Sequence, residues 1–192
     1  MKRSFIGQVA FIGPDMTGKS NIAEELSKQT GVPVFKNSGE WKTQLDSPDY
    51  FLNLLRFGGP FLMDFIRQTD VSVILDRFYP CEFVYSRAFN RETDEKALQW
   101  MDKNFAEIGG KFIICLREDY SDLVDDQYPD QLPTTMLTSL AIQYRNFAEW
   151  TKCDYLILYT DDMDLNKQVE KIKIFLGINK NESQAEDFCA HA

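Results

Sequence analysis

Residues 11–22, "FIGPDMTGKSNI", follow the pattern G-x-x-x-x-G-K-S, with Gly13, Gly18, Lys19 and Ser20 at the fixed positions. Glycines let a backbone wrap closely around an anion with its N–H groups pointing inward, where a side chain would block the approach. A lysine in this place reaches phosphate oxygens, and the following serine hydroxyl can bind Mg²⁺. The alternative is an ordinary glycine-bearing turn, and the flanking sequence decides between the two.

The flanking residues predict a strand before this loop and a helix after it. Residues 8–12, "QVAFI", form a short apolar run, and residues 19–31 place Ile22, Ala23 and Leu26 on one helical face. The strand, loop and helix order is the context that the pattern requires. We therefore predict a nucleoside triphosphate site, with the Lys19 side chain exposed at the loop. Its phosphate contacts are expected from Gly13, Pro14, Asp15, Met16, Thr17, Gly18, Lys19 and Ser20.

Length, composition and charge predict one α/β domain, residues 1–178, that acts on a small substrate. The chain has 192 residues, of which 44% are hydrophobic, and its formal net charge of −9 repels a phosphodiester backbone. Stable nucleic acid binding is not expected. Four cysteines without a C-x-x-C pair, and an N-terminus that leads directly into the first strand, favour a cytoplasmic protein without a membrane span. Residues 179–192 are polar and predict a disordered tail.

Strand-like runs alternate with helix-like segments along the chain. Further strands are predicted at residues 32–35, 71–75, 111–116 and 154–160. Helices are predicted at residues 81–89, 94–108, 135–152 and 164–175, and over residues 47–69 with a break at Gly58, Gly59 and Pro60. This alternation favours a parallel sheet that is covered on both faces and collects ligands at the carboxyl ends of its strands.

Polar residues from distant parts of the chain fall at or just after the ends of predicted strands. They are Asp15, Lys36, Asp76, Arg77 and Arg117. Because the carboxyl ends of parallel strands meet at one edge of a sheet, one crevice could hold them all. An acid such as Asp76 beside a phosphate loop can hold Mg²⁺ through water, together with Ser20, and Arg77 can bind a phosphate through two hydrogen bonds. The alternative is a plain salt bridge at the strand end.

The two motifs together resemble the thymidylate kinase and deoxyribonucleoside kinase family of P-loop kinases. Thymidylate kinases carry an acid at the third position of the loop, as Asp15 does in "GPDMTGKS", and a D-R-Y-x-x-S-x-x-A-Y motif, which appears here as "DRFYPCEFVY". Three motif positions match: Asp76, Arg77 and Tyr85. Three differ: Phe78, Cys81 and Val84.

The resemblance implies Mg²⁺-dependent phosphoryl transfer from ATP on a three-layer sandwich. Its five-stranded parallel sheet would have the order 2-3-1-4-5, with helices on both faces and a lid at about residues 117–132. Catalytic roles are implied for Lys19, Asp15, Arg77 and Arg117. Acceptor-binding roles are expected for Asp15, Lys36, Phe57, Arg77 and Tyr85. In such a site Arg77 grips the acceptor phosphate, Asp15 positions Arg77, and Phe57 stacks on the base.

The chain departs from the family in two places that bear on substrate choice. The family's base-contacting arginine falls near Gly59 or Pro60, so Arg56 or Arg67 would have to replace it. Residues 119–142, which include most of the expected lid, contain no arginine or lysine. Arg117, Arg145 or Lys19 would then have to neutralise the charge of the transferring group.

The leading hypothesis is a deoxynucleoside monophosphate kinase that phosphorylates a dTMP-like nucleotide. A deoxynucleoside kinase is the first alternative, with Glu40 as general base for a nucleoside 5′-hydroxyl. A kinase of a modified base in DNA and a nucleotide-binding module without transfer activity are the others. Whether the protein forms a homodimer is left open.

Overall fold

The computed structural model describes residues 7–36, 50–121, 123, 133–161 and 164–178. Glu40, most of the expected lid and the expected C-terminal tail therefore lie outside the described residues. None of the helices in the described part is long and apolar enough to cross a membrane.

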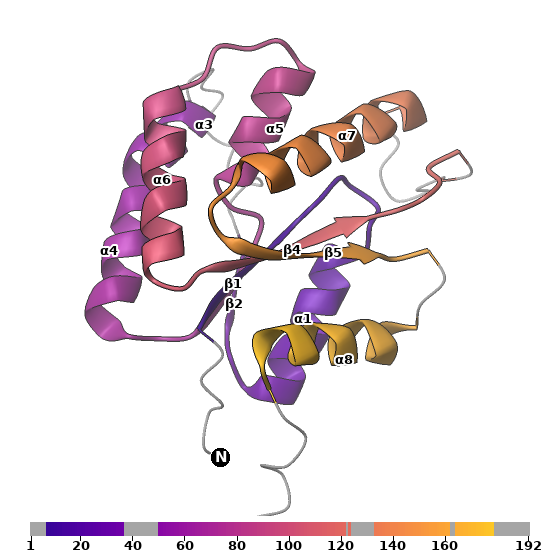
Figure 1. Ribbon diagram of the computed structural model, residues 1–192, viewed down its shortest axis with the longest axis horizontal. Helices are drawn as coiled ribbons and strands as arrows, with labels where there is room; N and C mark the ends of the chain where they lie inside the picture. The colour runs from indigo at the N-terminus through magenta and orange to yellow at the C-terminus, as the bar shows by residue number, and fades with distance from the viewer. Residues whose placement is uncertain (1–6, 37–49, 122, 124–132, 162–163, 179–192) are drawn as a thin grey trace, which may run out of the picture.

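A five-stranded parallel sheet forms the centre of the molecule (Figure 1). Its strands are β1 (Gln8–Ile12), β2 (Val34–Lys36), β3 (Val73–Asp76), β4 (Lys111–Leu116) and β5 (Asp154–Tyr159). They lie in the order β2-β3-β1-β4-β5, which confirms the expected order 2-3-1-4-5. β3 begins and ends later than predicted, so that it includes Asp76. β2 also begins later than predicted, after Pro33, because a proline has no N–H to donate to a neighbouring strand.

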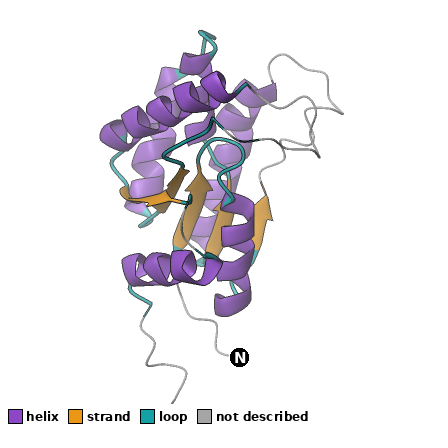
Figure 2. Cartoon of the chain, turned by 90° about the vertical axis from the view of Figure 1, so that its right-hand side faces the viewer, coloured by secondary structure: helices purple, strands orange, loops and turns teal. Residues whose placement is uncertain are grey.

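Helices cover both faces of the sheet, which gives three layers (Figures 1 and 2). One face carries α1 (Lys19–Thr30) and α8 (Leu165–Leu176). The other carries α4 (Gly59–Thr69), α5 (Pro80–Ala88), α6 (Glu95–Glu107) and α7 (Thr134–Trp150). Side chains alternate along each strand, so Val9 and Phe11 of β1 pack toward α1 and α8, while Ala10 and Ile12 pack toward the opposite layer.

The predicted helix break at Gly58, Gly59 and Pro60 is wrong, because the chain continues there as a helix. The helix α3 (Tyr50–Asn53) leads into a π-helical segment, η2 (Leu54–Gly58), and then directly into α4. The Gly59 N–H donates to the Leu54 carbonyl oxygen, five residues back, as in a π-helical turn. Pro60 then follows this π-helical turn directly, as the second residue of α4.

Asp102 of α6 connects three elements through hydrogen bonds, on the face of the sheet that carries α4 to α7. It is buried and accepts from the Tyr79 hydroxyl at 2.7 Å, the Thr151 hydroxyl at 2.5 Å and the Lys152 backbone N–H at 2.8 Å. These donors come from the residue before α5 and from the connection between α7 and β5. The carboxylate thus holds α5, α6 and the start of β5 together.

We expect Asp102→Ala to lower the free energy of unfolding by about 3 kcal/mol or more, because it leaves buried donors without an acceptor. Urea unfolding followed by circular dichroism measures this difference. Asp64→Ala is the matched control, since Asp64 is an exposed acid on α4 that pairs with Arg67 at 3.4 Å, and a change of less than about 0.5 kcal/mol is expected. Equal losses in the two variants would contradict the role of Asp102.

Candidate nucleotide site

A glycine loop, residues 13–18, connects β1 to α1 at the carboxyl edge of the sheet. Gly13 has a φ angle of 147°, and a Cβ there would overlap the Cys115 carbonyl oxygen of β4. Gly18 has a φ angle of 71° with open space around it. Glycine is therefore required there for its backbone conformation and not for lack of room. The first glycine is therefore needed for close approach to the neighbouring strand, and the second for the left-handed turn that starts α1.

The Lys19 side chain is folded into the glycine loop, so the expectation that it is exposed is wrong. The residue is 5% exposed. Its Nζ donates to the Pro14 carbonyl oxygen at 2.8 Å and lies 3.8 Å from Oδ1 of Asp15. The Thr17 hydroxyl donates to the same carbonyl oxygen at 3.0 Å. Burial, and then the nearby positive charge of Arg77, lower the pKa of Lys19 to about 8.

Arg77 stands directly after β3 and pairs with Asp15 of the glycine loop. Its guanidinium donates a hydrogen bond to Oδ1 of Asp15, and its backbone N–H donates to the Phe11 carbonyl oxygen at 2.9 Å. Arg77 has a φ angle of 68°, which is strained for a residue other than glycine. Burial alone would raise the pKa of Asp15, but the charges of Arg77 and Lys19 outweigh it and lower that pKa. Asp15 is therefore held as a carboxylate between two cations.

Residues of α5 and α7 surround the Arg77 side chain. Cys81 and Tyr85 of α5, and Tyr144 of α7, are all close enough to Arg77 to affect its pKa. The Tyr144 hydroxyl is fully buried with its ring and donates to the Cys81 sulfur at 3.5 Å. Burial raises the pKa of Tyr85 to about 12, so its hydroxyl stays protonated near neutral pH. Tyr144 was not anticipated from the sequence, where it reads as one more apolar position of a helix.

Asp76 at the end of β3 has the features of a metal-binding acid. It is 7% exposed, and its Oδ1 has no hydrogen-bond partner in the described part of the structure. Its Cα is paired in register with Phe11 of β1, immediately before the glycine loop. Among the described residues there is no cluster of three or more His, Cys, Asp or Glu side chains. Mg²⁺ fits such a site, because it keeps several waters and needs one or two protein ligands plus substrate phosphates.

Of three other residues named from the sequence, two are engaged in ion pairs and the third is exposed. Lys36, at the end of β2, donates to Oε1 of Glu24 on α1 at 2.9 Å. The Nε of Arg117 lies 3.2 Å from Oδ1 of Asp161 at the carboxyl end of β5. Phe57 of η2 is 69% exposed, and its ring is available to a ligand. The structure thus brings Asp15, Lys19 and Arg77 together, with Asp76 at the adjoining strand end.

The two arginines considered as base contacts are engaged along the helical layer. The Nε of Arg56 donates to Oδ2 of Asp94 at 2.7 Å, and the guanidinium of Arg67 donates to Oδ1 of Asn104 at 2.8 Å. Both partners belong to α6 or to its N-terminal cap. Either arginine would have to leave this partner before it contacted a base.

The fold is similar to that of several solved structures, kinases among them. The sequence matches no protein-family profile and no curated protein sequence. The YorR protein of Bacillus subtilis, solved in complex with phosphorylated GDP, has a TM-score of 0.65 and 19% identity over 89% of this chain and 96% of that chain. The deoxyadenosine kinase of M. mycoides, solved with the products dCMP and dCDP, has a TM-score of 0.56 and 16% identity over 88% and 98% of the two chains.

A gluconokinase of Sinorhizobium meliloti is also similar, with a TM-score of 0.56 and 14% identity over 91% of this chain and 94% of that chain. The deoxyadenosine kinase of M. mycoides has further been solved with bound dCTP and with bound dATP. At these identities the likeness establishes a shared fold. The residues of the site then have to carry any statement about the reaction.

We expect the affinity for inorganic tripolyphosphate to fall about five- to tenfold between pH 7.5 and pH 9. An anion binds the protonated form of Lys19, whose pKa of about 8 in the free protein means that most of the charge is lost by pH 9. Tripolyphosphate also loses its last proton in this range, and this change is the same for every protein variant. Isothermal titration calorimetry measures the affinity, and Lys19→Met is the control, for which the affinity should not fall over the same pH change. An equal pH dependence in both proteins would contradict this role of Lys19.

Proposed function

We propose that the protein is an ATP- and Mg²⁺-dependent deoxynucleoside monophosphate kinase with a dTMP-like acceptor. In this reaction the γ-phosphorus of ATP forms a bond to an oxygen of the acceptor's 5′-phosphate. Its bond to the β–γ bridging oxygen breaks, and ADP is the leaving group. The observation that carries the proposal is the Arg77 guanidinium, held by Asp15 beside the glycine loop and still 28% exposed at its side chain. A fixed, partly exposed arginine next to a phosphate cradle suits an acceptor that already carries a phosphate.

The donor side consists of the glycine loop and the start of α1. Loop N–H groups and the positive end of the helix dipole favour the β- and γ-phosphates of ATP. The Lys19 ammonium, which now donates to the Pro14 carbonyl oxygen, would turn to a phosphate oxygen over a short distance. Phosphoryl transfer needs little covalent help from the protein, so alignment and charge neutralisation provide most of the catalysis.

Asp76 and Ser20 are the residues that would hold Mg²⁺. Ser20 follows Lys19 in the first turn of α1, and the Oδ1 of Asp76 is buried without a partner among the described residues. When bound, the ion would neutralise charge on the β- and γ-phosphates. The protein's own contribution is to keep the Asp76 carboxylate in place through the β1–β3 pairing.

The acceptor side consists of Arg77, Asp15 and Tyr85. Asp15 fixes the guanidinium in one orientation, and the protonated Tyr85 hydroxyl can donate to the acceptor. Phe57 is proposed to stack on the base, and Lys36 and Arg117 to add positive charge at the two sides of the crevice. The latter two would have to exchange Glu24 and Asp161 for substrate oxygens.

We expect Lys19→Met to lower turnover with ATP and dTMP by at least about a thousandfold, because it removes the cation at the transferring group. The melting temperature should not fall, because the variant no longer buries a charged amine near Arg77. A coupled ADP-release assay and thermal unfolding measure the two quantities. Lys28→Met, on the exposed side of the same helix, should leave both unchanged. Near-normal turnover in Lys19→Met would remove the glycine loop from the mechanism.

We expect the wild type to prefer dTMP over thymidine by about a hundredfold or more in kcat/KM, because a nucleoside leaves the Arg77 guanidinium without its phosphate partner. Arg77→Ala should abolish this preference by lowering kcat/KM for dTMP. Arg87→Ala, which removes an arginine of α5 that pairs with Glu95 at 2.9 Å, should retain it. Initial rates at equal subsaturating concentrations give the ratios. A wild-type preference for thymidine that is lost in Glu40→Gln would instead identify a deoxynucleoside kinase.

A further inference from the structure

The two edges of the sheet differ in how well they are protected against pairing with another strand. β2, at one edge, has only three residues, follows Pro33 and ends in a lysine. β5, at the other edge, has six residues, and after Asp154 it contains neither a charge nor a proline. Natural proteins usually protect an edge strand by making it short or by adding lysine or proline. β5 has none of these protections.

The backbone of β5 offers hydrogen-bonding groups on its outer side. The Thr160 N–H donates to the Leu116 carbonyl oxygen of β4 at 3.0 Å. Because backbone groups alternate in direction along a strand, those of Tyr155, Ile157 and Tyr159 point away from β4. Within the described residues, β5 pairs only with β4. A further strand could therefore be added at this edge.

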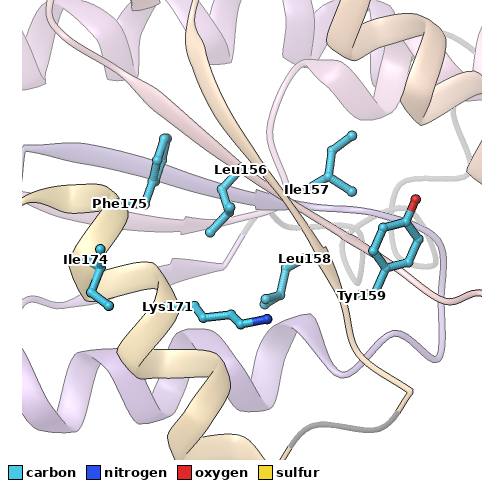
Figure 3. Close-up of a pocket in the computed structure, with 7 residues that line it drawn as sticks. All are labelled: Leu156, Ile157, Leu158, Tyr159, Lys171, Ile174 and Phe175. Atoms are coloured by element: carbon cyan, nitrogen blue, oxygen red, sulfur yellow. The ribbon is translucent and has the colours of Figure 1, made fainter.

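An apolar groove of about 420 Å³ runs along β5 on the side of α8 (Figure 3). Leu156 and Leu158 of the strand point toward α8, while Ile157 and Tyr159 lie on the other side. Ile174 and Phe175 of α8 line the groove, and Ile174 is 77% exposed. An apolar surface thus adjoins the open hydrogen-bonding edge, which is the combination that strand addition uses.

The sequence of β5 after Asp154 is the palindrome Tyr-Leu-Ile-Leu-Tyr, residues 155–159. We propose that this edge binds the same edge of a second copy of the protein, antiparallel, with the two-fold axis at Ile157. Tyr155 of one copy then lies opposite Tyr159 of the other, and Leu156 opposite Leu158. The outward backbone groups of Tyr155, Ile157 and Tyr159 bond reciprocally across the axis, and the two sheets join into one.

Charge also favours a second copy over another partner. Asp154 lies on the same side of β5 as Leu156 and Leu158, the side of α8 and its exposed Lys171. In the antiparallel pair, Asp154 of one copy and Lys171 of the other lie on the same face of the joined sheet. Residues 155–159 carry no charge, so like charges do not face each other along the five central positions of the seam.

Phe57, Phe61 and Phe65, one helical turn apart on η2 and α4, form a second exposed apolar surface. This row offers side chains alone, because a helix satisfies its backbone groups internally. β5 offers both apolar side chains and directed backbone bonds. It is therefore the edge strand, and not the phenylalanine row, that we assign to the contact between copies, independently of the reaction proposed above.

Two double variants test the pairing, because residues 155 and 159 of opposite copies face each other. In Tyr155→Lys/Tyr159→Lys two lysines meet at each end of the seam, whereas in Tyr155→Lys/Tyr159→Glu each lysine meets a glutamate. Both variants alter the same two partly exposed positions and lose the same two rings. Sedimentation velocity over a series of protein concentrations gives the dimer dissociation constant, and circular dichroism confirms folding.

We expect the wild type and the Lys/Glu variant to dimerise, and the Lys/Lys variant to dissociate with a constant at least about tenfold higher than that of the Lys/Glu variant. Phe61→Ser should dimerise like the wild type. A wild type that stays monomeric, or equal dissociation constants in the two double variants, would overturn the proposal. Loss of the dimer in Phe61→Ser alone would assign the interface to the phenylalanine row instead.

Discussion

The parallel pairing of β1 with β3 is the constraint on which the candidate site depends. It places Asp76 beside Phe11, and the Arg77 N–H continues the pairing by donating to the Phe11 carbonyl oxygen. The chain leaves β1 into the glycine loop and leaves β3 into Arg77, so two segments more than sixty residues apart in sequence emerge side by side. Asp15 then needs only a turn of the loop to reach the guanidinium. Geometry at the strand ends, rather than any one side chain, brings the charged groups together.

The cations of the candidate site are paired with groups of the protein itself. Lys19 and Arg77 share the carboxylate of Asp15, and Lys19 also uses a carbonyl oxygen of its own loop. The lowered pKa of Lys19 shows that this arrangement does not compensate the amine fully for its burial. A polyanion would supply the missing negative charge. A buried amine whose pKa is lowered by its surroundings is a candidate for a functional site, and Lys19 is such a group.

Apolar runs in the sequence were sufficient to predict a parallel sheet with helices on both faces. The strand order and the pairing of Asp15 with Arg77 were expected from the resemblance to the thymidylate kinase family, which rests on the two motifs. Three features could not be obtained in this way. The burial of Lys19 depends on the loop closing over Pro14, the hydroxyl of Tyr144 finds its partner only when α7 crosses α5, and the helix at Gly58 to Pro60 continues through hydrogen bonds of an uncommon kind. Each depends on contacts between groups whose proximity no local pattern encodes. Propensity alone would break the helix at two glycines and a proline, and tertiary packing, with Gly59 against Met101 of α6, overrides it.

The π-helical turn at η2 has a consequence for the lengths of chain that this fold can accept. A π turn holds one more residue than an α-helical turn while the helix axis continues in nearly the same direction. The segments on either side of η2, α3 and α4, can therefore keep their places, with α4 near α6, while the chain between them carries an additional residue. In an alignment of related chains, one-residue insertions and deletions would be expected to gather within residues 54–58. Such a change would rotate the aromatic side chain at position 57 around the helix axis relative to the site, while α4 stayed where it is.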